Sequence, residues 1–63
     1  MKNNVKITRV ALSMNQQDLA KKVGVTRQTI GFIEKGEYNP SLKLCISIAK
    51  ALNKTLDQLF WEE

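Results

Sequence analysis

The sequence predicts an all-α domain of five short helices, and three observations support this fold class. Apolar residues recur at helical spacing within the segments, as Leu19, Ala20 and Val23 do. Residues that cap helix N-termini precede the segments, and glycines follow two of them. The apolar fraction of 43% and the charged fraction of 25% are typical of a globular protein rather than a disordered one. We therefore expect a single domain over residues 1–63.

The first helix is expected at residues 5–12, with Asn3 or Asn4 as its N-terminal cap. The helical spacing predicts three inward-facing apolar residues, Ile7, Val10 and Ala11. Lys6 and Arg9 then lie on the outer face, and for Arg9 the sequence favours a solvated side chain. This helix is expected to pack against the next two and to close the core.

Residues 15–36 predict two short helices joined by a tight turn. Each begins at a capping residue, Asn15 or Thr26, whose side-chain oxygen can accept a hydrogen bond from a free backbone N–H of the first turn. Each ends at a glycine, Gly24 or Gly36, because glycine adopts the left-handed conformation at little cost. Two helices with about three residues and a glycine between them form the helix-turn-helix pattern.

Ser41 and Thr55 predict the starts of the fourth and fifth helices. The fourth is expected over residues 42–52, and Asn53 can end it in left-handed geometry. Its main apolar stripe consists of Leu44, Cys45, Ile48 and Leu52. We expect Cys45 to be a small buried hydrophobe rather than a reactive thiol, because the sequence has no histidine to activate it.

The positive charge is concentrated in one part of the sequence. The net charge is +4 and the isoelectric point is near 9.5. Residues 1–54 carry ten Lys and Arg against three acidic residues, a net +7, whereas residues 55–63 carry three acidic residues, a net −3. This distribution indicates a surface that meets a polyanion or, equally well on charge alone, a solvated basic surface.

Several functional classes are disfavoured. One cysteine and no histidine leave no intrachain disulfide and argue against a structural metal site. The sequence also lacks a paired-carboxylate site and a glycine-rich phosphate loop, so we expect neither an enzyme nor a cofactor. No apolar run approaches the roughly 20 residues of a membrane span and no secretion signal is evident, so a cytoplasmic protein is expected.

The outer face of the third predicted helix carries the strongest functional signal. Arg27 and Gln28 lie in its first turn, where helices of this kind approach DNA bases in the major groove. Arginine can pair with guanine and glutamine with adenine. Glu34, in the last turn, would be repelled by phosphate and is expected to pair with Arg9 or a lysine, or to orient a neighbouring arginine. The loop residues Tyr38 and Asn39 offer donors to phosphate, although Tyr38 could instead cover the core edge.

The run NQQDLAKKVGVTRQTIGFIEKGEYNPSLKL, residues 15–44, resembles the Cro/repressor-like helix-turn-helix family of prokaryotic transcription regulators, also called the XRE family. The motifs Q-x-D-L-A, G-V-T-R-Q-T-I, I-E-K-G and Y-N-P-S-L carry the resemblance. It implies a compact five-helix, lambda-repressor-like domain that binds duplex DNA as a dimer. Together with the reasoning above, it predicts base contacts at Arg27, Gln28 and Phe32, where Phe32 either touches thymine methyl groups or fills space between neighbours. The matching phosphate-binding positions are Gln16, Thr26, Thr29, Lys35, Tyr38 and Asn39.

The C-terminal segment carries more large apolar residues than a small core easily accommodates. Residues 55–63 are therefore expected to form a dimerisation element with the second apolar edge of the fourth helix, although a lid buried within one chain would also explain them. The predicted interface residues are Ile46, Leu56, Leu59, Phe60 and Trp61. Residues 2–4 and 60–62 could also pair as a short antiparallel ribbon, and the sequence leaves this open.

Two functional hypotheses follow. The first is a sequence-specific, DNA-binding regulator, most simply a repressor, that acts as a homodimer on a palindromic operator. The second is an antitoxin-like interaction module that binds a partner protein through the apolar C-terminal face, with Leu59, Phe60 and Trp61. The motifs favour the first.

Overall fold

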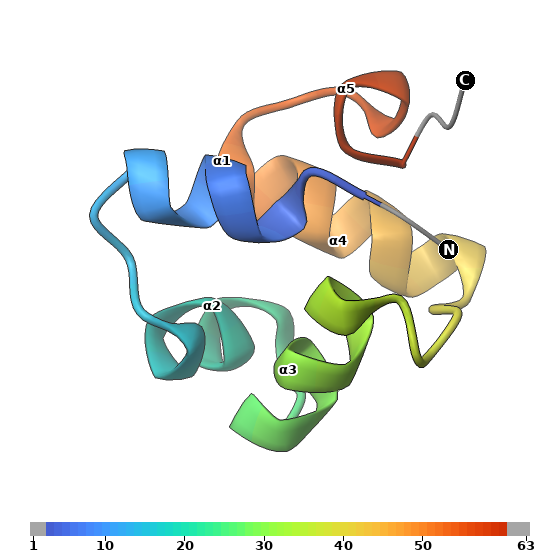
Figure 1. Ribbon diagram of the computed structural model, residues 1–63. Helices are drawn as coiled ribbons and strands as arrows, with labels where there is room; N and C mark the ends of the chain where they lie inside the picture. Colours follow the sequence, from blue (N-terminus) through green and yellow to red (C-terminus); the bar gives the residue numbers. More distant parts are fainter. Residues whose placement is uncertain (1–2, 61–63) are drawn as a thin grey trace.

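The computed structural model describes residues 3–60, which form five helices and no strand (Figure 1). The helices are α1 (Val5–Ala11), α2 (Gln16–Val23), α3 (Arg27–Lys35), α4 (Leu42–Leu52) and α5 (Leu56–Phe60). Helix α2 packs against α3 and α4, α1 contacts α3 and α5, and α4 contacts α5. The all-α, five-helix prediction is confirmed. None of the helices in the described range is long and apolar enough to cross a membrane.

The predicted N-terminal caps are present at α2, α3 and α4. Asn15 and Asp18 form a reciprocal capping box, in which Asp18 N donates to Asn15 Oδ1 at 2.7 Å and Asn15 N donates to Asp18 Oδ2 at 3.0 Å. Thr26 Oγ1 accepts from Thr29 N at 3.2 Å, and Ser41 Oγ accepts from Leu44 N at 3.2 Å. These bonds satisfy backbone donors that a helix cannot pair internally. They fix where each helix begins.

The predicted C-terminal caps also form. Gly24, Gly36 and Asn53 have φ values of 77°, 76° and 56°, and all three end their helices in the left-handed conformation. The N-terminal segment is attached differently, because Asn3 Oδ1 accepts from Val5 N whereas Asn4 makes no side-chain cap. Asn4 instead donates its backbone N–H to Leu59 O at 2.8 Å, which joins the start of α1 to α5.

The terminal ribbon that the sequence left open is not seen in the part of it that is described. Asn4 is in a bend and Phe60 is the last residue of α5, so neither is in a strand. Residues 2, 61 and 62, on which the ribbon also depends, lie outside the described residues.

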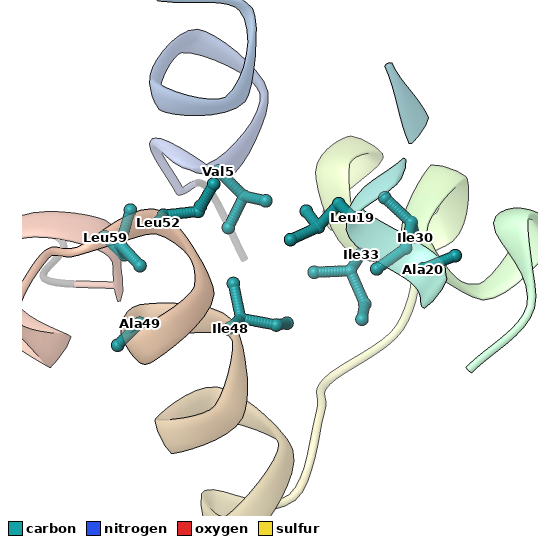
Figure 2. Packing of buried hydrophobic residues seen from close by; sticks show 9 residues of the cluster. All are labelled: Val5, Leu19, Ala20, Ile30, Ile33, Ile48, Ala49, Leu52 and Leu59. Atoms are coloured by element: carbon teal, nitrogen blue, oxygen red, sulfur yellow. The ribbon is translucent and has the colours of Figure 1, made fainter. Parts of the chain in front are cut away.

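The core lies between the α2–α3 pair and the remaining helices (Figure 2). Helices α2 and α3 contribute Leu19, Ala20, Ile30 and Ile33, and the other side consists of Val5, Ile48, Ala49, Leu52 and Leu59. Full burial of a Leu, Ile or Val side chain stabilises a fold by about 1.5–3 kcal/mol. The core therefore holds α3 in place from behind and leaves its opposite face to solvent.

The predicted orientation of the first helix is wrong. Ile7 and Val10 are 72% and 56% exposed and Ala11 is also exposed, whereas Val5 and Arg9 are buried. Val5 and Arg9 are four residues apart and therefore share one face of the helix. Arg9 can lie inside because it is paired with an acidic side chain of α3, so a charged residue occupies a position that the apolar pattern assigned to the surface.

Two predictions for the C-terminal half also need correction. Leu59 is fully buried in the chain's own core, so it has no surface to offer a second subunit. Leu56 and Phe60 are partly buried against the core, and Trp61 lies outside the described residues. Cys45 is only half-buried, and its thiol lies 3.7 Å from Pro40 O.

Candidate nucleic-acid interface

An open groove runs between the start of α2 and the outer face of α3. Its lining residues are Gln16, Gln17, Thr26, Arg27, Gln28, Gly31, Phe32 and Lys35. All three predicted base-contacting residues line it, together with three of the six predicted phosphate-binding residues. Because α2 and α3 lie side by side (Figure 1), residues from two helices meet at this one surface.

Arg27 and Gln28 occupy the first turn of α3 and are exposed. Within residues 3–60 neither side chain hydrogen-bonds to another residue, so their donors and acceptors face solvent. Phe32, one turn further along, is 41% exposed although it is a large apolar side chain. An exposed phenylalanine between cationic and amide groups can contact the methyl group of thymine.

Thr26 and Thr29 have structural partners in the free protein. Their hydroxyl oxygens are 2.9 Å apart, and Thr26 Oγ1 also caps α3. Thr26 still lines the groove, whereas Thr29 is half-buried and does not. Their predicted phosphate contacts therefore stay predictions, and Thr26 has a capping role in addition.

The end of α3 and the loop that follows it carry three more of the predicted phosphate-binding residues. Lys35 is exposed and lines the groove at the last position of α3. Tyr38 is 47% exposed, and Asn39 is exposed beside it, but neither lines the groove. Tyr38 is not among the residues packed against the core, so the alternative role as a core cover is not supported.

Arg9 and Glu34 form a buried ion pair behind the groove. Arg9 Nε donates to Glu34 Oε2 at 2.7 Å, and Arg9 Nη2 donates to Glu34 Oε1 at 3.3 Å. Arg9 Nη1 also donates to Met14 O at 2.7 Å. The predicted partnership of Glu34 is confirmed, and the predicted solvation of Arg9 is wrong.

Sequence reasoning missed two features of the site. Gln16 Nε2 donates to Glu34 Oε1 at 3.0 Å, which links the groove to the buried ion pair. Gln17 also lines the groove, and its place beside Gln16 in the first turn of α2 was the available signal. The link to Glu34 joins residues 18 positions apart, so helical spacing could not reveal it.

The groove carries positive charge. Arg27 and Lys35 line it, and Glu34, the nearby acid, is neutralised by Arg9. No cluster of His, Cys, Asp or Glu suited to a metal ion occurs in the described part of the chain. The chemistry of the surface is thus that of amide, guanidinium, ammonium and aromatic groups, which suits base edges and phosphates.

This chain is similar in sequence to known helix-turn-helix proteins. A family model described as helix-turn-helix matches residues 5–59. The HTH-type transcriptional regulator MJ0272 of Methanocaldococcus jannaschii is 52% identical over 60 residues, which cover 95% of this chain and 91% of that protein. The HTH-type transcriptional regulator YgzD of Bacillus subtilis is 48% identical over 63 residues, which cover 100% and 96% of the two chains.

The fold also matches a solved structure. The crystal structure of the restriction-modification controller protein C.AhdI from Aeromonas hydrophila superposes with a TM-score of 0.83 at 32% sequence identity. The match covers 89% of this chain and 85% of that one. With its five helices and its α2–α3 groove, the chain belongs to the Cro/repressor-like helix-turn-helix family of DNA-binding transcriptional regulators.

Proposed function

We propose that this protein is a sequence-specific repressor that binds a palindromic DNA operator as a homodimer. The observation that carries the proposal is the groove, in which Arg27, Gln28 and Phe32 face solvent beside Gln16 and Lys35. A helix fits the major groove of duplex DNA, and these side chains include the donors and acceptors that read base edges. A protein bound at a promoter blocks other proteins from the DNA that it covers, so repression requires DNA binding alone.

The residues divide into two roles. Arg27 and Gln28 read bases, and Phe32 contacts thymine methyl groups. The phosphate-binding residues set the register of α3 and add affinity that depends on salt. They are Gln16, Thr26, Thr29, Lys35, Tyr38 and Asn39.

An operator with two half-sites calls for two copies of this domain. Its Cα atoms extend 28 Å along the longest axis, whereas successive major grooves on one face of DNA are about 34 Å apart. One copy therefore reaches one half-site, and an inverted repeat needs two copies related by a two-fold axis.

The dimer surface is expected on α4 and α5. Leu42 and Ile46 lie one turn apart on α4 and are 68% and 38% exposed. Leu56 and Phe60 lie one turn apart on α5, which contacts α4, and both are only partly buried. Pairing of this edge with a second copy would remove apolar surface from water. The interaction-module alternative is weakened, because Leu59, one of the residues it needs, is inside the core.

Selection from a pool of random duplexes at about 150 mM salt tests the proposal. Enrichment of an inverted repeat is the expected result, and its half-site would show what Arg27 and Gln28 contact. Weak binding without enrichment would contradict sequence-specific recognition. Sedimentation at micromolar concentration, with and without the selected DNA, tests the dimer separately, and a single copy on the full repeat would contradict it.

A further inference from the structure

Gln16 differs from the other glutamines of the groove in how it is held. Gln16, Gln17 and Gln28 all line the groove. Gln16 is half-buried and donates to Glu34, whereas Gln17 and Gln28 are exposed and have no side-chain partner within residues 3–60. One of three similar side chains is thus attached to the buried interior.

We propose that Glu34 is a positioning residue for DNA binding, which orients the Gln16 amide toward the phosphate backbone. A glutamine amide nitrogen has two N–H donors. Glu34 Oε1 accepts one of them, and a phosphate oxygen in the groove can accept the other. This inference rests on the proposed function and concerns how one contact in it is prepared.

The side chains behind Gln16 hold one another in place, because Glu34 is bonded to Arg9 and Arg9 to a backbone carbonyl. The Glu34 side chain is 3% exposed and accepts from two nitrogens of Arg9. Arg9 is held in turn by Met14 O. A free glutamine side chain loses rotamer freedom when it binds, and one that is already oriented loses less.

Because its charge is neutralised, the Glu34 carboxylate can orient Gln16 close to DNA. An unpaired glutamate near the groove would repel phosphate, but Glu34 is paired with Arg9 behind α3. Gly31 contributes as well, because a Cβ at this position would be in van der Waals contact with Gln16 Nε2, at 3.8 Å, and glycine leaves that position empty. The space beside the Gln16 amide is therefore open.

The Gln16–Glu34 bond is not required to satisfy the buried acid. Glu34 Oε2 and Oε1 both accept from Arg9. The bond therefore does more for the direction of the amide than for the stability of the ion pair.

A double-mutant cycle in DNA affinity tests the inference. The apolar replacement Arg9→Met with Glu34→Leu removes the acceptor, and replacement of a buried pair by apolar residues usually preserves folding. We expect it to weaken binding to the selected operator by about 2- to 10-fold when Gln16 is present. In the Gln16→Ala background it should change affinity little. Equal losses in both backgrounds, or no loss in either, would overturn the inference.

The cycle also separates this inference from the proposed function. If Gln16→Ala and Arg27→Ala weaken operator binding but the cycle shows no coupling, only the positioning role of Glu34 fails. If neither substitution changes affinity, the proposed groove is not the binding surface, and both fail.

A second measurement needs no substitution. NMR relaxation of the side-chain amides in the free protein should show a restricted Gln16 amide, with Gln17 and Gln28 as matched mobile controls in the same groove. Equal mobility of all three amides would overturn the inference, because an ion pair with a purely structural role does not restrict Gln16.

Discussion

Arg9 Nε lies 2.7 Å from Glu34 Oε2, and this ion pair joins α1 to the last turn of α3 inside the protein. The two side chains are 9% and 3% exposed. Their separation of 25 residues makes the pair a long-range tie in a small core. Glu34 thereby connects the orientation of the first helix to that of the helix that faces DNA.

Removal of one partner should destabilise the fold severely. Arg9→Met leaves the Glu34 carboxylate buried without its cation, and such a loss typically costs about 3–5 kcal/mol. This is most of the stability expected of a domain of this size. Urea unfolding followed by circular dichroism should therefore show a large drop in the unfolding midpoint, or a protein that is unfolded in buffer.

The double variant Arg9→Met with Glu34→Leu is the control. With no buried charge left, most of the lost stability should return. A double variant as unstable as Arg9→Met would mean that the hydrogen bond to Met14 O, rather than the ion pair, is the larger contribution.

Gly31→Ala should stabilise the protein. Gly31 is inside α3, does not have a positive φ, and an added Cβ would meet only Gln16 Nε2 at 3.8 Å, an ordinary contact. Alanine in a helix interior is favoured over glycine by about 1 kcal/mol. Thermal unfolding should show Tm higher by about 4–8 °C.

Gly24→Ala is the matched comparison, with the opposite sign. An added Cβ at Gly24 would meet nothing within 4 Å, but its φ is +77°. The left-handed conformation costs a non-glycine residue about 1–2 kcal/mol. A lower Tm is therefore expected from backbone strain alone, and an unchanged Tm would contradict the assigned cap.

Cys45 should make stability fall at alkaline pH. Burial raises the pKa of its thiol above the ordinary value of 9.0, and a backbone hydrogen bond lowers it in part. Well below pH 9 the thiol is protonated in both the folded and the unfolded chain. As the pH rises from the unfolded pKa through the folded one, the unfolded chain loses its proton first, and the folded state loses stability.

Comparison with Cys45→Ala isolates this effect from lysine and tyrosine titration. The free energy of unfolding of the native chain should fall relative to that of the variant over the alkaline range from about pH 9 upward. A difference between the two proteins that stays constant over this range would show that the thiol titrates alike in both states.

Local chemistry made much of the fold predictable from the sequence. The caps at Asn15, Thr26 and Ser41 involve atoms within three residues of each other, so the spacing alone determines them. The same holds for Arg27 and Gln28, whose place in the first turn of α3 follows from the cap at Thr26. Their side chains face outward because Ile30 and Ile33 occupy the inner face.

The predictions that were wrong depend on contacts between distant residues. Burial of Arg9 depends on Glu34, and the exposure of Ile7 and Val10 follows from it. Leu59 packs near Val5 and Leu52 (Figure 2), so counting apolar residues in the last segment could not show which of them the chain's own core uses. A periodic pattern identifies the buried face of a helix only when apolar residues, rather than a buried charge pair, occupy that face.

Arg27→Ala should reduce both affinity and specificity for the operator. Loss of an arginine that pairs with a base typically costs about 1–3 kcal/mol on the cognate site. The preference should relax at the contacted position, and other positions should be unaffected. Binding titrations against the operator and its single-base variants measure this. An unchanged preference among the variants would remove Arg27 from the base-reading residues.

Lys35→Ala should weaken binding to all sequences alike. Lys35 lies at the end of α3 on the rim of the groove, and an ammonium there neutralises a phosphate rather than a base. Each neutralised phosphate contributes about 0.9 to the slope of log affinity against log salt. The slope should therefore flatten by about one unit per subunit.

Lys54→Ala is the matched control, because Lys54 lies in the connection between α4 and α5, which is on the side of the molecule away from α3 (Figure 1). Both variants lose one positive charge, so a contact at Lys35 predicts different slopes, whereas a general effect of net charge predicts equal ones.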